Sequence, residues 1–386
     1  MKTPIYLDYQ ATTPVDKRVV DAMHPYWTEM FGNPHSASHA FGWRAEAGVD
    51  IAREQIADLL FAQPEDIIFM SGATESDNLI IKGVMERFKG VKDHLITVKT
   101  EHSAVIEAAK NAVEHVGGTL TLLDVDGNGL ICLDALENAI TDRTALVSVM
   151  AVNNEIGVIQ PIEKIIEICH ARGVLVHVDA AQAVGKISLD AHGLGVDFMS
   201  FTAHKFYGPK GIGGAYVKKG KQRFIIPQMH GGSQELGLRA GTVSPPLCVG
   251  MGMAAKLCQE DMIEEEKRLR ALATHFFEGI KAVHPLVSIN GSTAHRWAGN
   301  LNIAFPGLDG AVLTADLKNL AVSSSSACSS TDNKPSRVLL AMGMDEKLAQ
   351  SSLRIGFGRM TTPEEVDFAI AEINRVVTDM GGLSLS

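Results

Sequence analysis

The chain has 386 residues, of which 46% are hydrophobic and 21% charged, a composition typical of a soluble globular protein. Its formal net charge of −10 disfavours a general nucleic-acid-binding surface, and no apolar run approaches the roughly 20 residues of a membrane span. Five cysteines without CxxC spacing and an N-terminus without an apolar signal segment predict a cytoplasmic protein with free thiols.

The N-terminal part of the chain begins with an extended segment over residues 1–15 and a polar loop over residues 32–39. In that loop His35 and His39 have the i,i+4 spacing of a metal pair on a helix. The glycine and proline beside them favour a loop, and no third ligand lies nearby, so we predict no metal site here. The segment from about Trp43 to Leu60 then carries apolar residues on one helical face.

A short strand, Ile67–Met70, is followed by small polar residues that lead into an apolar helix. Residues 71–78 read Ser-Gly-Ala-Thr-Glu-Ser-Asp-Asn. Small residues before a helix leave its first amides unpaired, and these amides with the Thr74 hydroxyl suit a phosphate group. Ordinary helix capping explains the same residues, and the sequence leaves both interpretations open.

Two further strands also end in polar residues. Leu95–Val98 is followed by His102, and Leu146–Val152 is followed by Asn154. An imidazole at such a place could stack on a flat ring and move protons, although a lone histidine there is more often structural. The Asn154 amide suits a substrate carboxylate or a cofactor oxygen. Between these strands residues 124–129 resemble the start of an EF-hand loop, but the twelfth position holds alanine, so we predict a surface turn.

The clearest chemical signal comes from two neighbouring strands. Residues 173–182 form an apolar run that ends in Asp179, and residues 196–211 place Lys205 just past a second buried strand. A carboxylate at the carboxyl end of a buried strand suits a ligand, and a partly desolvated lysine is a nucleophile toward an aldehyde. Pyridoxal phosphate needs both groups. Considered separately, Lys205 could equally be a solvated surface charge, and Asp179 could be a helix N-cap. Considered together, the two residues favour the cofactor site.

Strand and helix alternate through the middle of the chain, which predicts an α/β layer fold. Because the chain is too long for one ordinary core, we expect a large domain at residues 16–261 and a small α+β domain at residues 1–15 and 262–386. We predict an apolar helix over Leu247–Cys258, followed by a charged helix over Asp261–Val283 that links to the small domain.

Two features of the small domain suggest chemistry. Alternation within residues 353–359 places Arg354 opposite its apolar neighbours, where it suits either a carboxylate clamp or a surface salt bridge. Residues 323–335 are polar and rich in helix and strand breakers, and they carry Cys328 without an apolar anchor. This pattern predicts either a mobile loop with an exposed, reactive thiol or a linker with an incidental cysteine.

Together these segments resemble the cysteine desulfurase family, specifically its housekeeping group with a long cysteine-bearing loop that feeds iron–sulfur assembly. The resemblance covers nearly the whole chain and rests on residues 6–14, 71–78, 100–102, 152–157, 179–185, 200–213, 239–242 and 323–329. It implies a fold-type I pyridoxal-phosphate enzyme, with a mainly parallel seven-stranded sheet in the large domain. It also implies a homodimer with active sites at the subunit interface.

The resemblance further implies a role for each matching residue. Lys205 would carry the cofactor as a Schiff base and later remove the substrate Cα proton, and Cys328 would take the sulfur as a persulfide. Asp179 would pair with the ring nitrogen, Gln182 with the ring oxygen, and His102 would stack on the ring and assist proton transfer. The phosphate would be held by Ala73, Thr74, Thr202, His204 and Thr242 of the partner subunit; Asn154, which also touches the cofactor, and Arg354 would bind the substrate carboxylate.

The implied reaction converts L-cysteine to L-alanine, and the sulfur passes to an iron–sulfur scaffold protein and other acceptors. No intrinsic metal is expected, although Cys328 could ligate a cluster transiently with a scaffold partner. We expect no direct nucleic-acid or membrane partner. The alternatives are another fold-type I enzyme, such as a selenocysteine lyase or an aminotransferase, and a non-catalytic binding platform. An aminotransferase needs no thiol, and a platform would be expected to have lost Lys205, Asp179 or Cys328.

Three features depart from the family pattern. Ser325 stands where the family usually has glycine, Thr202-Ala203 replaces Ser-Gly before the histidine, and the chain ends at Ser386 without the longer tail that docks the scaffold. The second change keeps a hydroxyl. We expect these departures to affect partner docking more than the chemistry.

Overall fold

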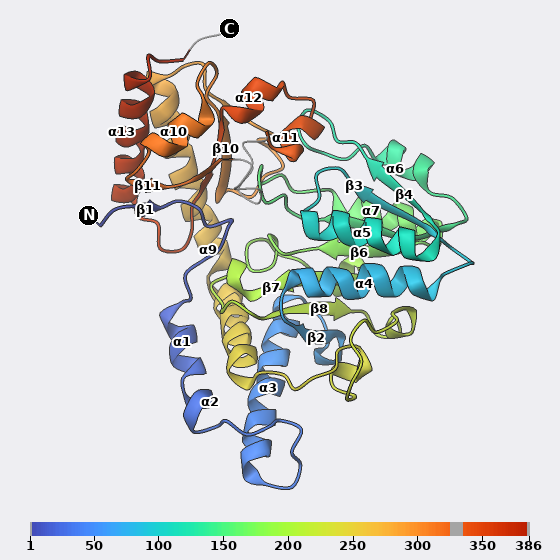
Figure 1. The fold of residues 1–386 in the computed structure, drawn as a ribbon. Helices are drawn as coiled ribbons and strands as arrows, with labels where there is room; N and C mark the ends of the chain where they lie inside the picture. Colours follow the sequence, from blue (N-terminus) through green and yellow to red (C-terminus); the bar gives the residue numbers. More distant parts are fainter. Residues whose placement is uncertain (1, 325–334, 384–386) are drawn as a thin grey trace.

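A seven-stranded sheet forms the centre of the larger part of the molecule (Figure 1). This computed structural model describes residues 2–324 and 335–383. The strands lie in the order β2 (Ile67–Met70), β8 (Gly213–Val217), β7 (Phe198–Thr202), β6 (Leu175–Asp179), β5 (Thr144–Met150), β3 (His94–Val98) and β4 (Thr119–Leu123). Only β8 runs antiparallel to its neighbours in this sheet. The predicted mainly parallel seven-stranded sheet is therefore confirmed.

Helices cover both faces of this sheet, which explains why its strands are nearly continuous apolar runs. Ile68, Leu95 and Leu146 point into a core shared with α4 and α5. The residues that follow them in the chain point into a second core, shared with α3 and α7. The helices of this part are α1 (Lys17–Met23), α2 (Pro25–Thr28), α3 (Ala40–Leu59), α4 (Ala73–Arg87), α5 (Ser103–Val116), α6 (Leu133–Ala139), α7 (Ile162–Ala171) and α8 (Ala191–Leu194).

One helix of 39 residues, α9 (Pro245–Val283), runs from beside α3 to beside α13 (Pro363–Asp379) (Figure 1). The prediction of two separate helices over Leu247–Cys258 and Asp261–Val283 is wrong. Neither proline nor glycine interrupts the junction, and the residues there, Gln259 and Glu260, are good helix formers. The sequence changes from apolar to charged because the helix is mostly buried from Cys248 to Cys258 and mostly exposed or partly exposed from Gln259 to Arg268.

A smaller four-stranded sheet lies at the other end of α9. Its strands are in the order β12 (Ser323–Ser324), β13 (Ser352–Gly356), β10 (Asn300–Ala304) and β9 (Ser288–Ile289), and β1 (Ile5–Tyr6) pairs separately with β11 (Leu320–Ala321). The surrounding helices are α10 (Gly310–Asp316), α11 (Arg337–Ala341), α12 (Glu346–Gln350) and α13 (Pro363–Asp379). None of the helices in the described ranges is long and apolar enough to span a bilayer. The predicted domain boundaries stay a prediction.

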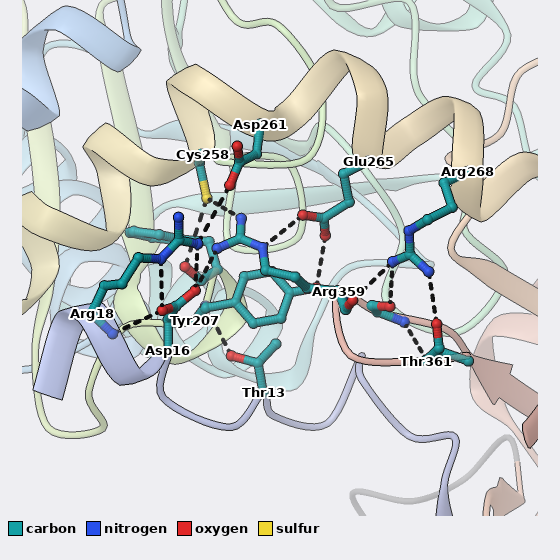
Figure 2. Close-up of polar contacts among 12 residues, drawn as sticks. Thr13, Asp16, Arg18, Tyr207, Cys258, Asp261, Glu265, Arg268, Arg359 and Thr361 are labelled. Atoms are coloured by element: carbon teal, nitrogen blue, oxygen red, sulfur yellow. Dashed lines mark hydrogen bonds and ion pairs between the residues drawn. The ribbon is translucent and has the colours of Figure 1, made fainter.

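A buried cluster of charged groups joins the segment after β13 to α9 and to the loop after β7 (Figure 2). The Arg359 side chain, 11% exposed, donates from Nε to Glu265 at 2.8 Å and from Nη1 to Asp16 at 3.1 Å. Its guanidinium also lies 4.2 Å from the centre of the Tyr207 ring. The Tyr207 hydroxyl donates to Glu265 at 2.8 Å and accepts from the Arg359 backbone N–H at 2.6 Å. Because Tyr207 follows Lys205 by two residues, this cluster fixes the lysine-bearing loop.

Replacing Arg359 with methionine is expected to lower the free energy of unfolding by about 3–5 kcal/mol, because Glu265, whose side chain is 13% exposed, would lose its cationic partner. Urea unfolding followed by circular dichroism measures this difference. Arg270→Met on α9 is the control, since Arg270 is 56% exposed and its partner, Glu266, is 40% exposed. The control should change the free energy by less than about 1 kcal/mol. An equal decrease in the free energy of unfolding in the two variants would contradict the expectation that a buried ion pair costs more to break than an exposed one.

Candidate active site

A cavity of about 550 Å³ lies where the parallel strands of the large sheet end, and Arg354 from β13 of the smaller sheet also lines it. Ligands of open α/β sheets commonly bind at this edge. Ten of the residues singled out from the sequence line it together: Ala73, Thr74, His102, Asn154, Asp179, Gln182, Thr202, His204, Lys205 and Arg354. Thr242 does not line it and is exposed on the surface. Cys328 lies outside the described residues.

Lys205 ends a short turn of 3₁₀ helix, Ala203–Lys205, directly after β7. Its Nζ donates to the backbone carbonyl of Gln10 at 2.5 Å and to that of Ala11 at 2.7 Å. The sequence analysis did not find these two carbonyls, because a backbone acceptor has no side-chain signature. They hold the amine at the wall of the cavity.

Asp179 is the last residue of β6 and is only 4% exposed. Burial raises the pKa of Asp179, and the backbone N–H of Ala181, which donates to its Oδ1 at 2.9 Å, opposes this shift. The nearby His102 and Lys205 also favour the ionised carboxylate. A cationic group inside the cavity would act in the same direction and is therefore the ligand that suits Asp179.

The N-terminus of α4 forms the anion-binding side of the cavity. The N-cap is Gly72, not Ser71 or Thr74, and no side chain caps the helix. The first amides and the positive end of the helix dipole therefore face the cavity, as a phosphate requires. A Cβ on Gly213 of β8 would lie 2.7 Å from the Gly72 Cα, so glycine is needed there to let the strand approach the cap.

Burial lowers the pKa of both His204 and His102. Burial lowers the pKa of His204 to about 4, with help from the positive charge of Lys205, and its Nδ1 lies 3.1 Å from the Thr12 Oγ1. Burial likewise lowers the pKa of His102, whose Nδ1 accepts from the Ala104 backbone N–H at 3.2 Å. His102 is thus the N-cap of α5 and also lines the cavity, so the structural interpretation and the functional one are compatible.

Arg354 is 3% exposed and makes a salt bridge from Nη2 to Asp8 at 2.8 Å. Its Nη1 donates to the backbone carbonyl of Asn154 at 3.2 Å. Within the described part of the chain, its Nε makes no hydrogen bond. The sequence analysis left a surface salt bridge and a carboxylate clamp open; the structure shows a buried salt bridge, and the clamp stays a prediction. Asp8, which also accepts from Ser323 Oγ at 2.8 Å, was not identified as a neighbour of the site from the sequence.

Glu155, next to Asn154, has an unusual titration. Burial raises the pKa of Glu155 to about 7, although the Ser336 hydroxyl, which donates to its Oε2 at 2.5 Å, opposes the shift. Ser336 is the N-cap of α11. The bond therefore ties the start of that helix to the residue beside the cavity.

Glu155 is expected to make the folded state less stable as pH rises from about 5 to 8. The folded chain holds a proton on Glu155 that the unfolded chain has released, so unfolding becomes easier through this range. Melting temperatures of the wild type and Glu155→Gln at both pH values measure the effect. The wild type should lose stability relative to Glu155→Gln at the higher pH. Glu114→Gln, on the exposed face of α5, keeps Glu155, so its melting temperature should differ from that of the wild type by the same amount at both pH values. A constant difference between wild type and Glu155→Gln would contradict this prediction.

The comparisons with known proteins agree with this geometry. The sequence matches the Aminotransferase class-V family over residues 5–368. It is 50% identical over 367 residues to a protein from Rickettsia akari named cysteine desulfurase IscS, and the match covers 95% of this chain and 89% of that protein. A solved structure titled NifS-like protein has a TM-score of 0.91 and 37% identity, covering 97% of this chain and 100% of that one.

A second solved structure, titled SspA in complex with cysteine, has a TM-score of 0.82 and 37% identity. It covers 91% of this chain and 98% of the other. Near full-length similarity to proteins of one kind, together with a cavity that suits an amine-bound phosphorylated cofactor, decides the family. The chain belongs to the Aminotransferase class-V family and, within it, to the pyridoxal-phosphate-dependent cysteine desulfurases.

Proposed function

We propose that this chain converts L-cysteine to L-alanine and passes the sulfur, held first as a persulfide on Cys328, to acceptors for iron–sulfur cluster assembly and other sulfur transfer. The observation that carries this proposal is the lining of one cavity. Lys205, Asp179 and Arg354 come from three different strands or strand ends, and the N-terminus of α4 completes the wall. An amine, a carboxylate, a guanidinium and an anion site thus surround one space.

The lining residues fit pyridoxal phosphate. Asp179 would hold the ring nitrogen, Gln182 the ring oxygen, and the α4 N-terminus with Thr202 and His204 the phosphate. When bound, the cofactor supplies an aldehyde for an amine and a ring that stores the electrons released at the substrate Cα. The cavity volume of about 550 Å³ lies within the range of small-molecule sites.

Each remaining role belongs to a side chain at the wall. Lys205 would take the Cα proton, because its amine is held in the cavity by the carbonyls of Gln10 and Ala11. Arg354 and Asn154 would orient the substrate carboxylate, with the guanidinium shared between that carboxylate and Asp8. His102, fixed by its bond to the α5 backbone, would stack on the ring and assist proton transfer.

The role of Cys328 rests on the sequence, and the described residues on either side support it. Ser323 on β12 pairs with Arg354 on β13, and Ser336 bonds to Glu155. The chain therefore leaves and rejoins the described structure beside the cavity. A nucleophile between these two points suits attack on the substrate sulfur.

The proposal includes a cytoplasmic homodimer, an iron–sulfur scaffold protein as sulfur acceptor, and domains at residues 16–261 and at 1–15 with 262–386. Exposed aromatic side chains, among them Trp27, Phe31 and Phe41, support an interface between subunits. Thr242 of the partner subunit would complete the phosphate site. Light scattering of the purified protein tests the dimer, and sulfur transfer to a purified scaffold protein tests the acceptor.

Incubation with L-cysteine tests the central reaction. With a reductant present, alanine and sulfide should form in equal amounts. Without a reductant, intact-protein mass spectrometry followed by peptide mapping should find one added sulfur atom on Cys328. Parallel assays with L-selenocysteine and with an α-keto acid distinguish a selenocysteine lyase and an aminotransferase. Absence of alanine, or sulfur found on any other cysteine, would disprove the proposal.

A further inference from the structure

Lys186 is a buried lysine for which the reaction has no assigned use. It follows Gln182 by four residues, is 7% exposed, and donates from Nζ to the Gln182 Oε1 at 2.5 Å. The ammonium also lies 4.6 Å from the centre of the Trp297 ring. Among the described residues, no carboxylate lies within ion-pair distance of this Nζ. A buried cation without a counter-charge is costly, and burial lowers the pKa of Lys186 well below its ordinary value, whereas the Gln182 oxygen and the Trp297 ring favour its charged form.

Two contacts together decide which way the Gln182 amide points: the Lys186 ammonium on its oxygen and the backbone carbonyl of Gln10 on its nitrogen. An ammonium only donates hydrogen bonds, so it requires the amide oxygen on its side. The amide nitrogen then faces the cavity side, where it donates to the backbone carbonyl of Gln10 at 2.9 Å. That same carbonyl accepts from Lys205 Nζ. An amide nitrogen has two N–H donors, and one of them is thus left for a group inside the cavity.

We propose that Lys186 is a positioning residue: it holds the Gln182 amide with its nitrogen toward the cavity and makes that amide a stronger donor to an anionic ring oxygen. The proposal rests on the proposed function, because it assigns the cavity to pyridoxal phosphate. The missing counter-charge of Lys186 would then be supplied, through the amide, by the bound cofactor. Hydrogen-bond chains that begin at a charged group strengthen their last donor in this way.

Lys186→Met tests the proposal, since methionine has similar length and removes both the charge and the donor. The apo variant should melt at a temperature equal to or above that of the apo wild type, because an uncompensated buried charge is gone. Its dissociation constant for pyridoxal phosphate should rise about tenfold, as expected for one hydrogen bond involving a charged group. The midpoint of the pH titration of the visible absorption band should rise by about one unit, because a nearby cation favours the deprotonated chromophore.

A double-mutant cycle shows whether Lys186 acts through Gln182. Gln182→Leu alone should weaken cofactor binding, and adding Lys186→Met should cause no further loss. Lys186→Arg, which keeps a cation and a donor, should retain more affinity than Lys186→Met.

The possible outcomes separate this inference from the proposed function. An unchanged affinity and titration in Lys186→Met, with a wild type that binds the cofactor on Lys205 and releases alanine, overturns the inference alone. Loss of folding in Lys186→Met, or a full further loss in the Gln182→Leu background, overturns it as well, because Lys186 would then be structural. A wild type that forms no adduct between pyridoxal phosphate and Lys205 overturns the proposed function.

Discussion

Lys205→Ala should lower the turnover of L-cysteine by at least about a thousandfold, the scale on which enzymes lose activity without their nucleophile or base. The substitution removes the amine that captures the cofactor aldehyde and the group that takes the Cα proton. Alanine formation measures the loss. Borohydride reduction followed by peptide mass spectrometry should find a pyridoxyl adduct on Lys205 in the wild type and none in the variant.

Lys205→Arg is the control that separates charge from nucleophilicity. The guanidinium can still donate to the carbonyls of Gln10 and Ala11, so the fold and the local charge should be kept. An arginine does not deprotonate in proteins and forms no bond to the aldehyde, so turnover should be lost equally. Activity within tenfold of the wild type in either variant would assign the chemistry to another amine.

Cys328→Ser should abolish sulfur transfer, again by at least about a thousandfold, while the visible absorption of the bound cofactor stays unchanged. A serine hydroxyl is protonated at neutral pH and cannot hold the sulfur as a persulfide. The adduct on Lys205 should remain. If Cys328→Ser still produced alanine from L-cysteine at the wild-type rate, the sulfur would not pass through this residue.

The described cysteines supply the controls for this experiment. Cys132 is exposed at the start of α6 and does not line the cavity, so Cys132→Ser should leave turnover unchanged. Cys169, Cys248 and Cys258 are buried. Burial raises the pKa of Cys169 and of Cys258 to about 12, which keeps these thiols protonated and unreactive.

The fold could be predicted because its signals are local. Apolar runs ending in polar residues mark parallel strands, and the carboxyl ends of such strands meet at one edge of a sheet. For this reason residues as distant in sequence as Thr74, Asp179 and Lys205 could be expected at one place, and the structure brings them to one cavity. Their individual roles stay predictions.

What the sequence missed depends on contacts between distant segments. The carbonyls of Gln10 and Ala11 reach Lys205 only because the N-terminal segment crosses the cavity, and backbone groups leave no trace in composition. Asp8 meets Arg354 for the same reason. The sequence analysis predicted two helices in place of α9 because the composition changes partway from apolar to charged. Such a change does not end a helix, since both kinds of residue include good helix formers.

The unbroken α9 limits how the molecule can move. At a rise of about 1.5 Å per residue, its 39 residues form a rod about 58 Å long. This rod packs against α3 at one end and α13 at the other, and one continuous apolar core contains residues of all three helices. Hinge closure of one half of the molecule upon the other would require bending the rod and opening that core. The continuous helix therefore favours local rearrangements at the cavity mouth, over movement of the overall frame, for admission of the amino acid and departure of the product.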